Sequence, residues 1–598
     1  MRVTRRRFVR NAAGMAGLAG AGRPLMAQAA KAANRQPAGE DPYLDQVKAN
    51  DEAAAALISE SRRSERRGGR VRQTGEALET LAAAFCAPES RFYRADSLLS
   101  PMEQLSAALR KAQHADGTID SGNLHSPPDT GFVVETVAAA LAVLRRNRAP
   151  RLSQIEENMS AFLRDAGEAL ATGGVHTANH RWVVCSALAR INALLPAAKY
   201  VARIDDWLGE GIDIDADGQY SERSAGIYSR VTDNALITVA RLLDRPSLLD
   251  PVRRNLDLNV YLMHPDGEIE TVGSRRQDQF MIGSISDYYL AYRYLAIRDN
   301  NALYGAVARF IEQQRLAPLE RTNRAIHFLE EPLLRRALPA DGVIPTDYAK
   351  VFPNSGLARI RRGDVSVTVY GGSDWPLGVA SGLASNPTFF TFRKGKAILQ
   401  SVRMGAAFFS LGAFHSAGLE ANGNRYSLHQ RFDVPYYQPL PKAQRNTRGD
   451  YPLTPAADQR FWNKMNFPNR PPSNVQTLEQ KVTITENQGV CELHFDLSGH
   501  EGVPVTIELS FRTGGQLSGS LQELPREKCF LLKQGFGKYR VGDDVIEFGP
   551  GQAEHQFLNL SGHSYMAHGG ALKAGGECVY ITGFTPFQKV ITIRGARA

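Results

Sequence analysis

The spacing of apolar residues changes once along this chain of 598 residues, and that change constrains the fold more than any other feature. From about residue 40 to 335 the spacing is helical: Val184, Leu188 and Ile191 share one face of a segment that ends before Pro196. Similar segments lie at 76–86, 131–146, 157–171 and 284–297. After about residue 350 the period becomes two. The sequence therefore predicts an α/α solenoid or toroid followed by a large antiparallel β-sandwich.

The expected domain organisation follows from these two periods. A single hydrophobic core stops growing at roughly 250–300 residues, so a chain of this length needs more than one. We expect an export signal at 1–29, an α/α domain at 30–340, a linker at 341–352 and a β-sandwich domain at 353–598. A cleft between two domains is a favoured place for a ligand.

The first 29 residues have the pattern of a twin-arginine export signal. Thr4 precedes an arginine run and Phe8, a weakly apolar Ala/Gly stretch follows, and residues 27–29 form an A-x-A cleavage site. This pattern predicts a periplasmic or secreted protein that meets the twin-arginine translocase during export. Beyond the signal no apolar run approaches the ~20 residues of a membrane-spanning helix, so no stable membrane span is expected.

Charge and cysteine content limit the classes of partner. The formal net charge of +9 falls to +3 without the signal, which contains six arginines and no acidic residue, and so weakly basic a protein does not indicate a nucleic-acid partner. The five cysteines are an odd number without a C-x-x-C pair, so they predict neither a disulfide framework nor a zinc ribbon. Cys185 and Cys491 fall on apolar stripes and are expected in the core.

Polar side chains crowd the start of one predicted helix, in the sequence GVHTANHRW. Asn is among the best N-cap residues, so capping alone explains Asn179. Capping does not require His176 and His180 beside it. We expect this segment to cap the helix and also to turn side chains toward a cleft.

The loop DGQYSERSAGIYSR at 217–230 contains two tyrosines among charged residues: Tyr220, Glu222, Arg223, Tyr228 and Arg230. A neighbouring guanidinium group lowers the phenol pKa of ~10, because it favours the phenolate. A tyrosine here is therefore a candidate general acid or base, and the next helix is expected near Asp233.

Two further segments contain candidate ligand-binding residues. After a predicted turn at 264–267, Arg275 and Arg276 form a pair that can bind carboxylate or sulfate through bidentate hydrogen bonds. His415 and Tyr426 lie in a later stretch rich in aromatic residues. Sugar stacking and burial within strands explain that stretch equally well.

Together these segments resemble the heparinase II/III-type polysaccharide lyases over about residues 175–280. The resemblance rests on an NH pair at a helix start, on the pattern DGxYxExSxxxYxxV and on PDGEIxxxGSRRQD. It implies an incomplete α/α toroid followed by an antiparallel β-sandwich. It also implies an anionic polysaccharide as the partner, cleaved by β-elimination beside a uronic acid.

The resemblance also implies roles for individual residues. Asn179 matches the asparagine that neutralises the uronate carboxylate, and His180 matches a histidine that binds substrate or acts as a base. Tyr220 and Tyr228 match the region of the catalytic tyrosine, and Tyr228 is preferred because it lies in the ExSxxxY part. Substrate-binding residues are expected at His176, Glu222, Arg223, Arg275, Arg276, His415 and Tyr426.

The sequence departs from the family at its metal site. The H-x-H-x-D element of many members is absent, since residues 371–403 contain no histidine. No cofactor is predicted, and a structural zinc or calcium ion is left open. The DIDADG segment at 213–218 resembles a calcium loop, but Ser224 stands where an EF-hand needs glutamate.

The sequence is compatible with two alternatives to a lyase. The first is a glycoside hydrolase on the same α/α scaffold, with two carboxylates among Asp217, Glu222 and Asp278 placed ~5–5.5 Å apart for retention or ~6.5–9.5 Å apart for inversion. The second is a non-catalytic glycan-binding protein, in which the cleft survives without the chemistry.

Overall fold

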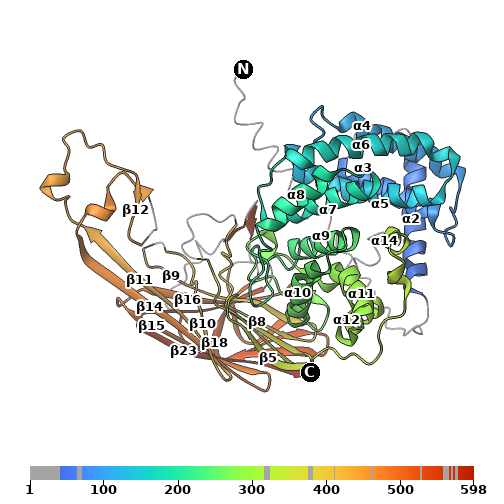
Figure 1. Cartoon of the computed structure of the whole chain (residues 1–598). Coiled ribbons are helices and arrows are strands. Elements are labelled where there is room, and N and C mark those ends of the chain that lie inside the picture. Colours follow the sequence, from blue (N-terminus) through green and yellow to red (C-terminus); the bar gives the residue numbers. More distant parts are fainter. Residues whose placement is uncertain are drawn as a thin grey trace. The chain divides into compact units, whose positions relative to one another are not determined.

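The computed structural model divides the chain into two compact units, each described here by itself (Figure 1). The helical unit comprises residues 1–260 and 284–344, and the β unit comprises residues 261–283 and 345–598. The described residues are 41–62, 71–314, 324–374, 382–409, 411–458, 462–525, 528–555, 565–567, 570–572 and 577–597. The predicted export signal lies outside them.

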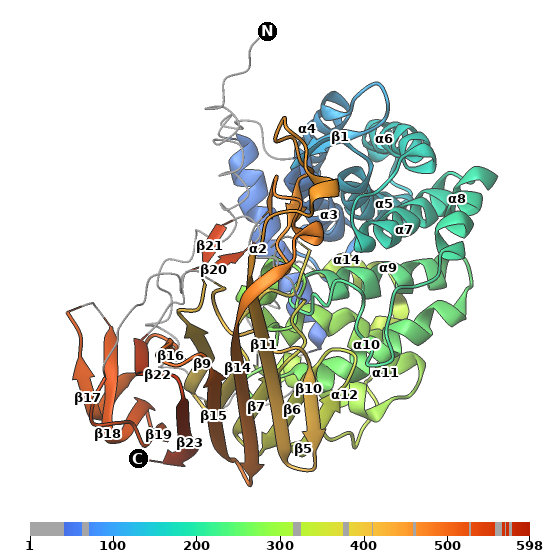
Figure 2. The ribbon, with the colours of Figure 1, turned by 90° about the vertical axis from the view of Figure 1, so that its left-hand side faces the viewer.

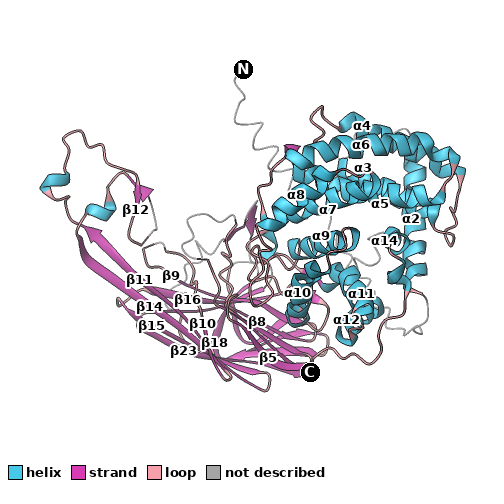
Figure 3. Cartoon of the chain, viewed as in Figure 1, coloured by secondary structure: helices cyan, strands magenta, loops and turns pink. Residues whose placement is uncertain are grey.

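Helices make up most of the helical unit (Figure 3). They are α2 (Pro42–Arg62), α3 (Val71–Cys86), α4 (Leu99–Ala112), α5 (Pro127–Asn147), α6 (Ser153–Thr172), α7 (Ala178–Leu194), α8 (Ala198–Gly209), α9 (Tyr228–Leu242), α10 (Leu249–Leu262), α11 (Tyr289–Arg298), α12 (Ala302–Gln314) and α14 (Ala325–Glu330). A hairpin of β1 (Ile119–Ser121) and β2 (Asn123–Ser126) lies between α4 and α5. The helical period predicted for this part of the chain is confirmed.

Helices α3, α5, α7 and α9 pack side by side as an inner layer, with α4, α6 and α8 outside them. The inner helices run in one direction. A Cβ on Gly75, early in α3, would lie 3.3 Å from Val133, early in α5, and at the other ends Cys86 Sγ lies 3.7 Å from the Val143 carbonyl oxygen. Their N-terminal ends therefore meet at one end of the unit.

Helix α5 is apolar enough to resemble a membrane span. Among the described helices it is the one whose length and composition would allow it to cross a membrane. It packs between α3 and α7, and most of its side chains are buried there. Its apolar character is therefore that of a central core helix.

The inner helices, together with α11 and α14, line a cavity of about 370 Å³, called the lumen below. It extends from Arg72, Phe132 and Arg230, in the first two turns of α3, α5 and α9, to charged groups deeper in the unit. There Arg190 donates to Glu330 at 2.6 Å and to Glu135 at 2.7 Å. A buried arginine with two carboxylate partners keeps its charge compensated.

Strands dominate the β unit (Figure 2). They are β3 (Glu268–Ile269), β5 (Asp347–Phe352), β6 (Leu357–Arg362), β7 (Val365–Tyr370), β8 (Phe390–Lys394), β9 (Ala397–Ala406), β10 (Leu419–Asn422), β11 (Arg425–Tyr437), β12 (Thr454–Pro455), β13 (Trp462–Asn463), β14 (Pro472–Asn487), β15 (Val490–Gly499), β16 (Pro504–Phe511), β17 (Gln516–Glu523), β18 (Cys529–Val541), β19 (Asp544–Gly549), β20 (Tyr565–Ala567), β21 (Gly570–Leu572), β22 (Glu577–Phe584) and β23 (Phe587–Arg597). The two-residue β4 (Gly283–Ser284) lies where the chain returns to the helical unit.

Fifteen strands form one continuous sheet in the order β10-β11-β14-β15-β23-β19-β18-β22-β16-β9-β8-β7-β6-β5, with β17 beside β18. Within the described residues, neighbouring strands of this sheet are antiparallel except β18 with β22. The part of the sheet around β15 and the part around β8 share one apolar core, since the ring centroids of Phe495 in β15 and of Phe389, just before β8, lie 6.2 Å apart. These two parts thus form the two layers of a sandwich, and the predicted fold class is confirmed.

The period of two is visible in β15. Cys491, Leu493 and Phe495 are buried, whereas Glu492 and His494 between them are exposed. Alternate side chains of a strand point to opposite faces, so one face of β15 lines the sandwich core. Cys491 and, in the helical unit, Cys185 are core residues as expected.

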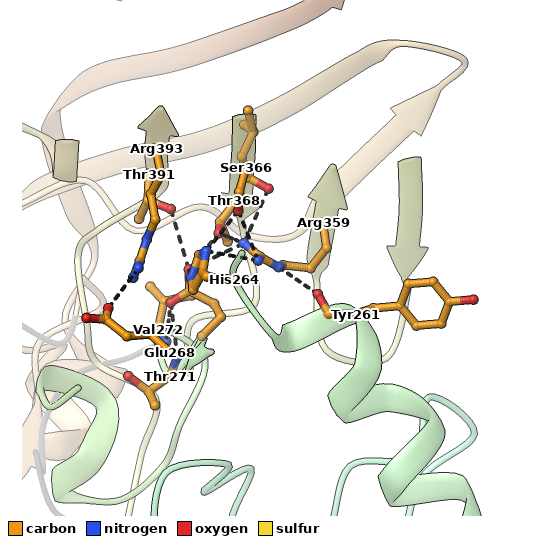
Figure 4. Close-up of polar contacts among 12 residues, drawn as sticks. Tyr261, His264, Glu268, Thr271, Val272, Arg359, Ser366, Thr368, Thr391 and Arg393 are labelled. Carbon is orange, nitrogen blue, oxygen red and sulfur yellow. Dashed lines mark hydrogen bonds and ion pairs between the residues drawn. The ribbon is translucent and has the colours of Figure 1, made fainter. Parts of the chain in front are cut away.

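Residues 261–283 are anchored in the β unit by buried polar contacts (Figure 4). The ring of His264 is fully buried, and its Nδ1 lies 2.8 Å from Ser366 Oγ and 3.2 Å from Arg359 Nη2. Burial and nearby guanidinium groups lower the pKa of His264, so its neutral ring can accept at Nδ1. Glu270 accepts a hydrogen bond from Thr368 at 2.6 Å and lies 3.7 Å from Arg359 Nη1.

A second set of ion pairs holds the strand of the same segment. Glu268 of β3 accepts two hydrogen bonds from Arg512, at 2.6 and 3.0 Å, and lies 2.7 Å from Arg393 Nη1. Arg359 also donates to the Tyr261 carbonyl oxygen at 3.1 Å (Figure 4). These partners come from strands on both sides of β9, so the segment is part of the sheet's packing.

These contacts change the domain organisation expected from sequence. The α/α domain was expected to run uninterrupted over 30–340, but 261–283 belongs to the β unit. The expected linker at 341–352 contains β5, which pairs with β6, so the domain expected at 353–598 begins earlier. Local periodicity cannot reveal this arrangement, because the partners of the inserted segment lie about 100 to 240 residues further along the chain.

We expect Arg359→Ala to lower the free energy of unfolding of the β unit by about 3–5 kcal/mol, because the substitution leaves Glu270 buried without its guanidinium partner. Arg361→Ala, on the same strand, is the control, since Arg361 is half-buried and donates to the Gly363 carbonyl near the surface. Urea unfolding followed by near-ultraviolet circular dichroism measures both. Equal losses in the two variants would contradict the assigned role.

The lumen generates a pH prediction. Enclosure raises the pKa of Glu79 from 4.5 to about 8, although the charge of Arg190 opposes this. The folded protein then holds a proton that the unfolded chain releases above pH ~4.5, so this group makes stability fall as pH rises toward 8. Glu79→Gln should flatten that fall, whereas Glu103→Gln on the exposed face of α4 should not. Melting temperatures at pH 5 to 8 measure the difference; parallel curves for wild type and Glu79→Gln would refute the assignment.

Candidate active site

The first turn of α7 attaches the loop that precedes α9. Asn179 Nδ2 donates to Glu222 Oε2 at 2.6 Å. Arg181 donates to Asp213 at 2.7 Å, and Trp182 Nε1 donates to the same carboxylate oxygen at 3.2 Å. Three side chains within four residues of α7 therefore fix the loop that contains Tyr220 and leads to Tyr228.

Asn179 does not cap its helix, contrary to the expectation. Helix α7 begins at Ala178 with Thr177 in the N-cap position, so the Asn179 side chain is released toward the neighbouring loop. That side chain is 2% exposed. The carboxylate of Glu222 fixes the orientation of the Asn179 amide, because only the amide nitrogen can donate a hydrogen bond to a carboxylate. Within the described residues the amide oxygen has no hydrogen-bond partner.

Two histidines flank this asparagine. The His180 ring lies edge-on to His176, with ring centroids 4.8 Å apart, and edge-on to Phe132 of α5, with centroids 6.0 Å apart. Edge-to-face contacts of this kind fix the orientation of a ring. His176 is exposed and His180 is half-buried. Both were expected from the sequence, whereas Phe132 was not, since it appears there only as one more apolar residue of a core helix.

The two tyrosines occupy different environments. Tyr220 is 3% exposed, and its hydroxyl donates to buried Asp233 at 2.7 Å. Burial, and then the adjacent carboxyl group, raise the pKa of Tyr220 well above 10.0. The lowered pKa expected for a tyrosine among arginines is therefore wrong for Tyr220, whose hydroxyl holds the loop to α9.

Tyr228 is the first residue of α9 and is half-exposed. Its backbone N–H lies 3.0 Å from the Ser224 carbonyl oxygen and 3.1 Å from Ser224 Oγ, so the helix begins five residues before the expected start near Asp233. Because the inner helices share one direction, this hydroxyl belongs to the same end of the unit as Asn179. Of the two candidate tyrosines, Tyr228 is the accessible one.

The acidic residues of the calcium-like segment stabilise the loop itself. Asp213 binds Arg181 and Trp182, and Asp215 Oδ1 accepts the backbone N–H groups of Asp217 at 3.0 Å and Gln219 at 2.9 Å. Glu222 and Arg223 lie between the tyrosines, and both are partly exposed. Arg223 has a φ of 49°, which marks a tight turn. Glu222 and Arg223 thus lie in the loop that joins the first turn of α7 to α9.

The remaining candidates lie in the β unit. Arg275 binds Asp374 through Nε at 2.8 Å and Nη2 at 2.9 Å, and Arg276 is half-buried. The ring nitrogens of buried His415 face backbone carbonyl oxygens, at 2.9 and 3.2 Å. Tyr426 is fully buried in the sandwich core. The substrate-binding role expected for His415 and Tyr426 is therefore corrected, since a buried ring cannot stack on a sugar.

Comparison with known proteins agrees with this architecture. No protein-family model matches the chain, and no curated protein matches its sequence. Among solved structures, the chain is similar to the chondroitin AC lyase of Streptomyces coelicolor A3 in complex with chondroitin sulphate, with a TM-score of 0.55 and 13% identity over 94% of this chain and 80% of that chain. It is also similar to a heparinase III, with a TM-score of 0.51 and 10% identity over 87% and 76% of the two chains. The chain therefore has the fold of these polysaccharide lyases.

Proposed function

We propose that this chain is an exported polysaccharide lyase, periplasmic or secreted, that cleaves a uronic-acid polysaccharide by β-elimination and leaves 4,5-unsaturated uronate ends. The observation that carries the proposal is the amide of Asn179, fixed by Glu222 beside His180, at the end of the helical unit where Tyr228 begins α9. The shared fold with polysaccharide lyases supports it.

The chemistry requires stabilisation of negative charge. The C5 proton of a uronate is weakly acidic, because its removal adds charge to a group that is already a carboxylate. A donor aimed at that carboxylate stabilises the enolate-like species that develops. One hydrogen of the Asn179 amide is directed at Glu222, and the other has only a long contact with Thr177 Oγ1 at 3.3 Å. That second hydrogen is the one we assign to the substrate.

The helices add to this effect. Helices α5, α7 and α9 begin at the same end of the unit, and each contributes a partial positive charge at its N-terminus. This arrangement favours an anionic ligand there. Exposed His176 and half-exposed Arg223 are the proposed contacts with other sugar groups.

The elimination then needs one base and one acid. A base takes the C5 proton, the electron pair of the C–H bond forms the C4–C5 double bond, and the bond from C4 to the glycosidic oxygen breaks. Tyr228 donates its phenolic proton to the departing oxygen, and the phenolate regains a proton afterwards. His180 is the proposed base or substrate ligand, and no water is consumed.

A two-carboxylate hydrolase fits the same site less well. Of the carboxylates considered for it, Asp278 is fully buried and accepts a hydrogen bond from Ser274 at 2.5 Å. Asp217 belongs to the turn stabilised by Asp215, and Glu222 is bonded to Asn179. In an elimination Glu222 orients the Asn179 amide, and this role agrees with the hydrogen bond between the two side chains.

The reaction class is tested on a panel of uronate polysaccharides. Ultraviolet absorbance of a C4–C5 unsaturated product is recorded together with the release of reducing ends. We expect both signals to rise together on at least one substrate. Reducing ends without absorbance would establish a hydrolase instead, and binding without either signal would establish a glycan-binding protein.

We expect Tyr228→Phe to lower kcat by about 10²–10⁴-fold with KM nearly unchanged, because general acid catalysis is lost while binding surfaces remain. Tyr220→Phe is the matched control: it should lower the melting temperature, since Asp233 loses its partner, but keep most of the turnover. Steady-state kinetics and thermal unfolding of both variants check this. The reverse pattern would transfer the catalytic role to Tyr220.

A further inference from the structure

The hairpin between α4 and α5 places two histidines and two aspartates together outside the candidate active site. They are His114, Asp116, Asp120 and His125, within the twelve-residue sequence HADGTIDSGNLH. The turn that precedes β1 depends on Gly117, which has a φ of +83° and approaches α6 so closely that a Cβ would lie 2.0 Å from the Asp165 carbonyl oxygen. This part of the hairpin is therefore held firmly against the helices.

The four side chains form a compact group of nitrogen and oxygen donors. His114 Nε2 lies 2.9 Å from Asp120 Oδ1, and His125 Nδ1 lies 2.8 Å from Asp116 Oδ2. The two imidazole rings are stacked, with centroids 3.9 Å apart and planes inclined by 19°. Both rings thus present a nitrogen to a carboxylate on the same small surface.

We propose that His114, Asp120 and His125, with Asp116 as a fourth ligand, bind one divalent transition-metal ion of the Zn²⁺ type. The ligand atoms of the first three lie within 4.8 Å of one another. Tetrahedral Zn²⁺ with bonds of ~2.0–2.1 Å separates its ligand atoms by ~3.3 Å, so small rotations of partly exposed side chains complete the site. Imidazole with carboxylate suits this class of metal, whereas Ca²⁺ and Mg²⁺ prefer oxygen ligands.

Further contacts hold the carboxylates in place. Asp116 Oδ1 accepts the hydroxyl of Thr118 at 2.6 Å and its N–H at 3.0 Å, which leaves Oδ2 directed at His125. Asp120 Oδ1 accepts the N–H of His125 at 2.7 Å. These hydrogen bonds lower the pKa of both aspartates, which keeps them ionised. Such outer contacts orient the ligands of metal sites.

A bound ion would fix the end of the helical unit at which the candidate active site lies. Ser126, the N-cap of α5, follows His125 directly. Pro127 approaches Gly173 so closely that a Cβ on the glycine would lie 2.5 Å from its Cγ, and Gly173 stands three residues before His176. The proposed role is therefore structural. It is independent of the proposed lyase activity.

The test uses the full chain, stripped of metal with a chelator and desalted. We expect one equivalent of Co²⁺ to produce the visible absorption bands of a tetrahedral site, Zn²⁺ to displace it, and either ion to raise the melting temperature. If the metal-free chain did not bind one equivalent of Co²⁺, the proposal would be overturned. Polysaccharide turnover plays no part in the readout, so the outcome is separate from that of the lyase assay.

Variants locate the ion. The double variant His114→Ala, His125→Ala should no longer bind the equivalent of metal, whereas His429→Ala should still bind it, since His429 lies outside the hairpin and pairs with Glu479 at 2.9 Å. Asp116→Asn preserves shape in case the double variant does not fold, and its affinity should fall at least about tenfold. Affinities equal to wild type in these hairpin variants would place the metal elsewhere and refute the site.

Discussion

The common direction of the inner helices is the constraint on which the candidate site depends. Each inner helix is followed by an outer one that returns the chain, so the next inner helix starts again at the same end. Residues that are about fifty apart in sequence then become neighbours, and the hydrogen bond from Asn179 to Glu222 is the clearest case. The chemistry therefore gathers in the first turns of α7 and α9 and in the loops that precede them, while the later turns mainly serve packing.

Both units place charges where water is largely excluded, and both compensate them. In the helical unit Arg190 lies between Glu135 and Glu330. In the β unit Arg359 lies beside Glu270. Such networks contribute less to net stability than their number suggests, because desolvation offsets much of the attraction. Their effect is on specificity. A charged segment is buried only where its partner charge is present, which favours one arrangement of the chain over others.

The sequence predicted the fold because the two hydrophobic periods are long and clear. It also indicated the loops of the site, since histidines, tyrosines and arginines are concentrated there. It could not separate Tyr220 from Tyr228, because burial depends on Asp233 in the following helix. It assigned substrate binding to Tyr426 and His415, which are buried, because the sequence does not show which side chains of an aromatic-rich stretch face the core. The insertion of 261–283 was invisible for a similar reason, since its partners are distant in sequence.

That insertion has a consequence for how the protein is made. The chain passes between the two units three times, near residues 260, 283 and 344, so no single cut separates them into continuous pieces. Glu268 leaves the ribosome 244 residues before Arg512, an interval of about 12–50 s at roughly 5–20 residues per second. During that time its carboxylate has no arginine partner from β16's end of the sheet. Segment 261–283 therefore lacks part of its packing until most of the polypeptide has been synthesised.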